Sequence, residues 1–214
     1  FIAVTSQPVP YHADTTAIFN TLCQQNSNSL LLDSAEIGSK NSLQSLILIN
    51  AAVKINCLGN QVTFRALNAN GKQVLNEIHP VLSQLGTVSA VNFDNEFSVQ
   101  FAPLDNQLDE DSKLQAATIF DGLRVISKHY QHSSTPVFLG GLFAYDLVAN
   151  FIPMQGVELK DDGIHCPDYS FYLAENLITI DHQTQQATLK SFCFSQEEQV
   201  EVAKTALSIA QKLK

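Results

Sequence analysis

An acid and a hydroxyl group follow directly after a short run of leucines near the N-terminus. Residues 30–40 read Leu-Leu-Leu-Asp-Ser-Ala-Glu-Ile-Gly-Ser-Lys, so Asp33 and Ser34 close the apolar run. Three leucines between polar residues are too few for a separate helix, and they predict a strand buried on both faces. A strand that ends in an acid and a hydroxyl can hold the polar end of a small ligand. In the alternative interpretation, the two side chains only satisfy backbone groups in a turn.

The other residue types that carry chemistry form no recognisable catalytic or metal-binding pattern. The four cysteines are scattered singly, without the Cys-x-x-Cys spacing of a zinc or thioredoxin-type site. His129 and His132 lie three residues apart near an expected helix end, where capping explains them better than a metal does. Gly140 and Gly141 stand inside an apolar run, which indicates a close backbone approach rather than a phosphate cradle. We therefore predict no catalytic residue and no metal ligand in this chain.

Composition and charge indicate a globular protein and argue against two classes of partner. The chain has 214 residues, of which 45% are hydrophobic and 15% charged, and its formal net charge is −9. This composition is ordinary for a folded domain, while the excess of negative charge disfavours nucleic acid and anionic membranes. No signal peptide is visible, and no apolar stretch reaches the length of about 20 residues that spans a bilayer. Together with the single cysteines, these features predict a cytoplasmic protein.

The elements that must position these residues alternate irregularly between strands and helices. Strands are expected over 1–5, 30–32, 43–50, 53–57, 62–66, 87–93, 96–101, 137–147, 170–180 and 188–194, with a hairpin turn at Gly59-Asn60. Helices are expected after Asp14, over 74–85, from a start at 109–111 through the apolar stripe 116–130, and over 195–213. A turn is expected at 68–71 and a kink or split at Pro80.

This order predicts the α+β class, with antiparallel sheets and helices packed on one side. We expect a single domain over residues 1–214, because no linker or repeat divides the chain. The last helix reaches Lys214 without a Gly, Asn or Pro stop, so more protein is expected after it.

Several segments, in order along the chain, resemble the N-terminal part of anthranilate synthase component I. They are 17–23, 30–37, 104–111, 138–147 (Phe-Leu-Gly-Gly-Leu-Phe-Ala-Tyr-Asp-Leu), 166–175 (Cys-Pro-Asp-Tyr-Ser-Phe-Tyr-Leu-Ala-Glu) and 180–183. The family converts chorismate and ammonia to anthranilate and pyruvate in tryptophan synthesis, and a glutamine amidotransferase subunit supplies the ammonia. The resemblance implies that the chorismate- and magnesium-binding residues lie in a C-terminal domain of a longer polypeptide. It therefore implies that this chain has no cofactor of its own and is inactive alone.

The resemblance also implies that the leucine run and its polar end belong to an L-tryptophan feedback-inhibition site. Ser34 matches the family serine that contacts the inhibitor. Asp33 stands where the family usually has Glu, and Gln44 stands where close relatives carry a Lys near the pocket. An acid and a hydroxyl can hold the ammonium end of tryptophan while leucine side chains shelter its indole ring.

Two other functions remain compatible with the sequence. Aminodeoxychorismate synthase component I is a sister enzyme of the same fold, in which the equivalent site would hold tryptophan permanently. The Asp33-Ser34 end and the segment 166–168 favour the anthranilate enzyme over it. A free-standing interaction module without a ligand is the third possibility, and the missing stop after the last helix argues against it.

Overall fold

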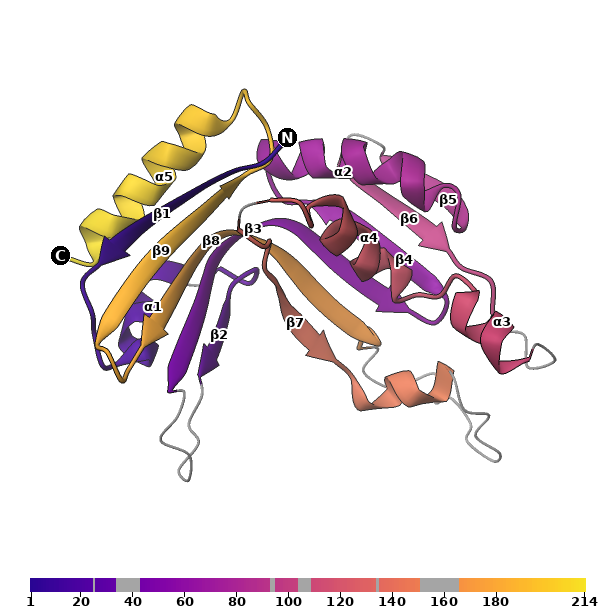
Figure 1. Cartoon of the computed structure of the whole chain (residues 1–214), viewed down its shortest axis with the longest axis horizontal. Coiled ribbons are helices and arrows are strands. Elements are labelled where there is room, and N and C mark those ends of the chain that lie inside the picture. The colour runs from indigo at the N-terminus through magenta and orange to yellow at the C-terminus, as the bar shows by residue number, and fades with distance from the viewer. Residues whose placement is uncertain (25, 34–42, 93–94, 104–108, 134, 151–165) are drawn as a thin grey trace.

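One bent antiparallel sheet forms the framework of the molecule (Figure 1). The computed structural model describes residues 1–24, 26–33, 43–92, 95–103, 109–133, 135–150 and 166–214. The strands are β1 (Ala3–Val9), β2 (Leu30–Asp33), β3 (Gln44–Leu58), β4 (Gln61–Ala66), β5 (Thr87–Asn92), β6 (Glu96–Gln100), β7 (Leu139–Phe143), β8 (Tyr169–Asp181) and β9 (Gln186–Cys193). The helices are α1 (Thr15–Cys23), α2 (Ala69–Leu82), α3 (Glu110–Gln115), α4 (Asp121–His129) and α5 (Gln199–Lys212), with a 3-10 helix, η1 (Tyr145–Asn150).

The two longest strands, β3 and β8, run side by side through both halves of the sheet. The strand order is β1-β9-β8-β3-β4-β6-β5, with β2 added to β3 and β7 added to β8. Every strand pair in the described part of the chain is antiparallel. The register between β3 and β8 shifts around Asn50 and Ala51, and shifts of this kind bend a sheet. Figure 1 shows the sheet bent along β3 and β8. The predicted α+β class is confirmed.

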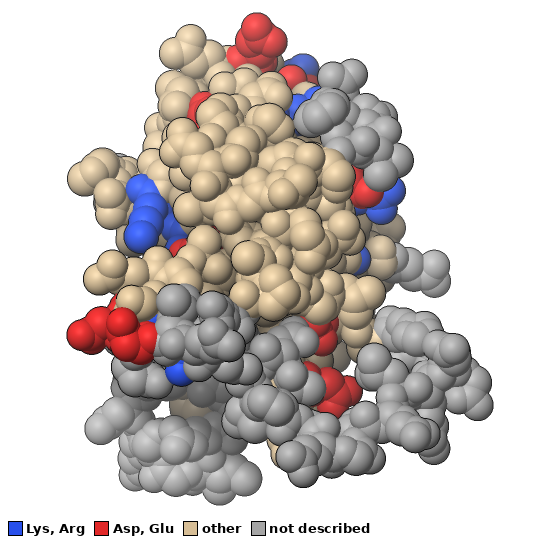
Figure 2. Space-filling model, turned by 90° about the vertical axis from the view of Figure 1, so that its right-hand side faces the viewer, with Lys and Arg blue, Asp and Glu red and all other residues tan. Residues whose placement is uncertain are grey.

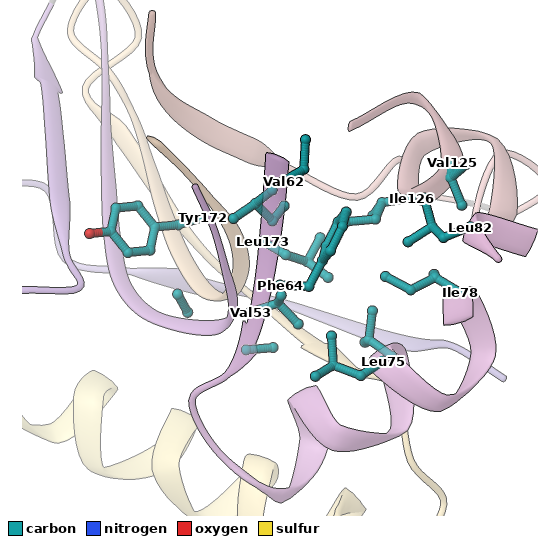
Figure 3. Packing of buried hydrophobic residues seen from close by; sticks show 14 of the residues in the cluster. Val53, Val62, Phe64, Leu75, Ile78, Leu82, Val125, Ile126, Tyr172 and Leu173 are labelled. Carbon is teal, nitrogen blue, oxygen red and sulfur yellow. The ribbon is translucent and has the colours of Figure 1, made fainter. Parts of the chain in front are cut away.

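Each half of the sheet is covered by its own helices. The half around β4 packs against α2 and α4. Figure 3 shows the side chains that meet there, namely Val53, Val62 and Phe64 from the strands and Leu75, Ile78, Leu82, Val125 and Ile126 from the helices. The other half packs Ile47, Ile178 and Leu189 against α1 and α5. Each large apolar side chain buried in this way stabilises the fold by about 1.5–3 kcal/mol.

The helix predicted to start at 109–111 and to carry the apolar stripe 116–130 is wrong in one respect, because the structure divides it into two helices. α3 starts at Glu110, as predicted, but it ends before Ala116, whose backbone is extended (φ −64°, ψ 139°). The backbone N–H of Thr118 then donates to a carboxylate oxygen of Asp121 at 2.7 Å, and α4 begins there. The apolar stripe continues across the break, and apolar periodicity therefore cannot reveal it.

Three predictions at proline and turn residues also differ from the structure. β1 continues through Pro8, which an edge strand tolerates because one side of its backbone has no partner strand. Asn68 does not lie in a separate turn. It caps α2, since its side-chain oxygen accepts from Gly71 N at 2.8 Å. α2 also continues past Pro80 to Leu82 without dividing.

Two glycine positions behave as predicted. Gly59 has a φ of +57° in the turn between β3 and β4, so the hairpin is confirmed. A Cβ atom at Gly141 would lie 2.2 Å from the carbonyl oxygen of Ser170, so the close backbone approach is confirmed, but it is made by β8 of the same sheet and not by another sheet.

Uncharged residues dominate the side of the molecule shown in Figure 2. Lys and Arg appear there as separate residues rather than as a continuous basic strip over the described atoms. Among the described residues, none of the helices combines the length and apolar character required to cross a membrane. That nucleic acid is not a partner stays a prediction.

Candidate functional site

The leucine run forms a short strand at the side of β3. Leu30 lies opposite Leu48, and Asp33, the last residue of β2, lies opposite Ser45. The prediction that this strand is buried on both faces is wrong, because Leu32 is 41% exposed. In the described sheet β2 pairs with β3 alone, so its outer side has no partner strand. The strand therefore carries its acid to an open edge of the sheet.

Two hydroxyl groups hold the Asp33 carboxylate. The Thr15 hydroxyl, at the start of α1, donates to Oδ2 at 3.3 Å, and the Ser45 hydroxyl donates to Oδ1. Ser45 is fully buried, whereas Asp33 is exposed. These partners are side chains of other elements rather than backbone groups of a turn. The arrangement fixes the direction of an acid that solvent can still reach, which favours the ligand-binding interpretation of Asp33.

A histidine and a tyrosine continue this hydrogen-bond chain. His182 Nε2 lies 2.8 Å from the Ser45 hydroxyl, and His182 Nδ1 lies 3.1 Å from the Tyr11 hydroxyl. Because the Ser45 proton is given to the carboxylate, Ser45 can only accept from His182, so Nε2 carries a proton. In the neutral ring Nδ1 then accepts from Tyr11. These hydrogen bonds together fix the direction of the Ser45 hydroxyl and the tautomer of His182.

This set of residues does not form a hydrolytic triad, although it contains a serine, a histidine and an acid. In a triad the acid accepts from the imidazole, whereas here Asp33 accepts from the hydroxyl of Ser45 itself. Ser45 is also closed to solvent, so a substrate cannot reach its oxygen. The arrangement orients a carboxylate, and it provides no nucleophile.

The three predicted site residues have different outcomes. Asp33 has the surroundings described above, and Ser34 lies outside the described residues. Gln44 is the exposed first residue of β3. Successive residues of a strand point to opposite faces, so Gln44 and Ser45 face opposite sides of the sheet, and Asp33 shares the side of its partner Ser45. The structure thus brings Asp33 to Ser45 and Thr15, but it does not bring the Gln44 side chain to the same face.

Sequence reasoning did not identify Thr15, Ser45 or His182 as part of this edge. The sequence did offer a signal for Ser45, because it is a polar residue within a mostly apolar run, at a position that the structure buries. Thr15 and His182 are separated from Asp33 by 18 and by well over 100 residues, and only the folded topology brings them together. No group of three His, Cys, Asp or Glu side chains among the described residues could hold a metal ion.

Comparisons with known proteins give one consistent name. The chain is 84% identical to anthranilate synthase component 1 of Haemophilus influenzae over all 214 residues, which correspond to the N-terminal 41% of that protein. It is 44% identical to the protein of that name in Vibrio cholerae over 196 residues, covering 90% of the chain and 36% of the relative. The corresponding protein of Buchnera aphidicola from Acyrthosiphon pisum is 35% identical over 210 residues, 95% of the chain and 39% of the relative.

The chain therefore spans about two fifths of the length of these curated relatives. No protein-family model matches it. The resemblance inferred from the sequence segments is confirmed, because the similarity to anthranilate synthase component 1 extends over the whole chain.

Proposed function

We propose that the chain is the N-terminal, regulatory part of an anthranilate synthase component 1. The observation that carries this proposal is the 84% identity over all 214 residues to an N-terminal segment of the Haemophilus protein. On this proposal the complete enzyme converts chorismate and ammonia to anthranilate and pyruvate in the cytoplasm. Chorismate and magnesium would bind in the remaining part of the polypeptide, and a glutamine amidotransferase subunit would supply the ammonia. The isolated chain would then bind no cofactor and turn over no chorismate.

The regulatory ligand proposed for this part is L-tryptophan, bound at the open edge formed by β2 and β3. The Asp33 carboxylate supports this proposal, because two hydroxyls of the described structure orient it while the residue stays exposed. A carboxylate in this state can accept from the ammonium group of an amino acid. The partly exposed leucines of β2 offer apolar surface for an indole ring. Ser34 is the other proposed contact with the ligand, and Gln44 is proposed to lie near the pocket, on the opposite face of β3 from Ser45.

Feedback inhibition of the full-length enzyme tests the proposal. The ratio of anthranilate formation with and without tryptophan should report inhibition separately from any change in activity. We expect Ser34→Leu and Asp33→Asn each to raise the tryptophan concentration for half inhibition by about tenfold or more, because each removes a polar contact with a charged group. Asp111→Asn, which removes an exposed acid on α3, serves as the control. Unchanged inhibition in the two site variants would refute the site.

The chain itself permits a second measurement. It contains no Trp, so indole fluorescence in a titration comes from the ligand alone. If the rest of the polypeptide supplies the other wall of the pocket, this chain should bind tryptophan only weakly, and the full-length protein should bind it well. Anthranilate production by the 214-residue chain would contradict the proposal that the catalytic residues lie elsewhere.

A further inference from the structure

A pocket of about 350 Å³ lies at the register shift between β3 and β8, and it is lined by other residues than those at the tryptophan edge. Its floor includes Asn50 and Ala51 of β3 and Glu175 of β8. Its walls come from the start of α2 and the first turns of α5, which approach each other above the bend (Figure 1). Neither the proposed activity nor the tryptophan site uses these residues.

An irregularity of the sheet places Glu175 at this position. Asn50 lies opposite Asn176 and Ala51 lies opposite Ala174, so Glu175 has no partner on β3. An extra residue of this kind forms a bulge, which bends the strand and redirects a side chain. The same irregularity that bends the sheet therefore turns a carboxylate toward the pocket.

The Glu175 carboxylate is buried and only half satisfied. The residue is 7% exposed, and its Oε2 atom accepts from the side-chain amides of Asn68 and Asn70, each at 2.8 Å. Among the described residues no group donates to Oε1. Oε1 is not closed off, because it is not one of the buried side-chain atoms that lack a hydrogen-bond partner in the described structure. This oxygen is therefore open to the pocket and can accept from the donor of a bound ligand.

Asn70 shows that the surroundings of Glu175 are rigid. Its amide nitrogen also donates to the carbonyl of Phe192 at 3.0 Å, and its amide oxygen accepts from Phe194 N at 2.6 Å. The residue is 2% exposed. With both ends of the amide fixed by β9 and the chain after it, Asn70 cannot rotate to satisfy Oε1. Oε1 of Glu175 is therefore the carboxylate oxygen that remains available to a ligand in the pocket.

The charge of the pocket indicates the kind of ligand. Glu198 and Glu201 of α5 line it with Glu175, and no Lys, Arg or His is among the described lining residues. Burial raises the pKa of the Glu175 carboxyl, and the nearby charge of Glu198 raises it further. A bound cation would offset both effects. A single metal ion is a poor fit, because no three acidic, His or Cys side chains in the described structure converge as its ligands would.

We propose that this pocket binds the primary ammonium group of an aliphatic amine, with Glu175 as the buried anionic anchor. The apolar side chains of Ala51, Leu67 and Val202 line the pocket beside the carboxylates and suit an alkyl stem. The same chemistry is presented by a free amine and by a lysine side chain of a protein segment. The proposal is independent of the tryptophan site, since the two sites share no residue.

Binding of n-butylammonium to the 214-residue chain, followed by NMR near pH 8, tests the proposal. We expect saturable shifts of signals from Asn70 and Val202, and a loss of affinity of about tenfold or more in Glu175→Gln, because a charged hydrogen bond is removed. Gln preserves the acceptor for Asn68 and Asn70, so this variant should fold. Glu197→Gln is the matched control, as Glu197 is exposed and does not line the pocket. Glu201→Gln provides a second variant at the pocket mouth, with a smaller expected loss.

Each arm of the experiment has a defined meaning. Equal binding of 1-butanol, no saturable shift, or equal losses in Glu175→Gln and Glu197→Gln would each overturn the proposal. If Glu175→Gln does not fold, an unchanged affinity in Glu201→Gln overturns it instead. A capped Gly-Lys-Gly peptide distinguishes the sources. Tighter binding of the peptide than of butylammonium identifies a lysine side chain as the ligand, and the reverse order identifies a free amine.

Discussion

Asp33 and Glu175 are two carboxylates that the same protein holds in opposite ways. Each accepts two hydrogen bonds from uncharged side chains, which are hydroxyls for Asp33 and amides for Glu175. Asp33 ends a regular ladder at an open edge, whereas Glu175 lies in a bulge and is 7% exposed. At the edge, water solvates the charge and the hydroxyls only fix its direction. In the bulge, the side-chain amides of Asn68 and Asn70 must replace the water that the Glu175 carboxylate loses on burial. The backbone that carries these two amides therefore has to keep a fixed position.

This difference predicts that the two regions tolerate change unequally. The Glu175 region depends on α2 lying directly against β3, and its donors are themselves held by other groups. The Asp33 region depends on a few side-chain contacts at the rim. Substitutions around the buried acid should therefore destabilise the fold more than substitutions around the exposed one.

The largest effect is expected where α2 meets β3. A Cβ atom at Gly71 would lie 1.9 Å from the carbonyl oxygen of Ala52, so Gly71→Ala must displace the helix that carries Asn68 and Asn70. We expect a loss of about 3 kcal/mol or more in the free energy of unfolding, measured by urea denaturation. Gly59→Ala is the control, since its Cβ meets no atom and its positive φ costs about 1 kcal/mol. Equal losses in the two variants would contradict the close-packing argument.

Removing the amide of Asn70 is the next largest change. Asn70→Ala loses the donor to Glu175 and the two contacts with the backbone of Phe192 and Phe194. We expect a loss of about 2–3 kcal/mol in the free energy of unfolding, because buried groups are left without partners. Asn28→Ala, at a partly exposed position of the same pocket, is the control and should change it by under about 0.5 kcal/mol. A loss at Asn70 no larger than this control would show that the buried acid does not depend on it.

The sequence singled out Asp33 as a candidate site residue but did not single out Glu175, and the reason is physical. Asp33 directly follows a run of leucines, so a local change from apolar to polar residues marks it. Glu175 stands inside the expected strand 170–180, and its pocket arises from a bulge and from two helices that begin far away in the chain. The available signal for Glu175 was its charge within a mostly apolar strand, which could have marked it as a candidate site residue.

Most strands and the Gly59 hairpin followed from local patterns. The expected strands 43–50 and 53–57 instead form the single strand β3, and the expected strand 137–147 ends at Phe143. The break before α4 depends on the side chain of Asp121.

The pH dependence of stability gives a further test of the buried acid. Burial raises the pKa of Glu175 in the folded state above its value in the unfolded chain. The folded state then binds the proton more tightly, so the stability associated with this group is greatest below the unfolded pKa and is lost as pH rises through the folded pKa. Glu175→Gln should remove this loss. The difference in unfolding free energy between wild type and variant should therefore shift in favour of the variant with rising pH.

Urea denaturation at a series of pH values measures that difference. Glu197→Gln, which removes one exposed charge, controls for the change in net charge. A constant difference between wild type and Glu175→Gln across the acidic range would contradict the assigned effect of burial.

The smallest effect is expected at the exposed acid, where Thr15→Val removes one hydroxyl and keeps the shape of the side chain. The Thr15 bond to Asp33 is 3.3 Å long, and Ser45 still holds the other carboxylate oxygen. We expect a loss of under about 1 kcal/mol in the free energy of unfolding. A double-mutant cycle with Ser45→Ala sharpens the test, because both hydroxyls act on one carboxylate and their losses should not be additive. Strictly additive losses would mean that the two hydroxyls do not act together on Asp33. If Thr15→Val alone lowered the free energy of unfolding as much as Asn70→Ala does, Asp33 would depend on its neighbours for solvation just as Glu175 does.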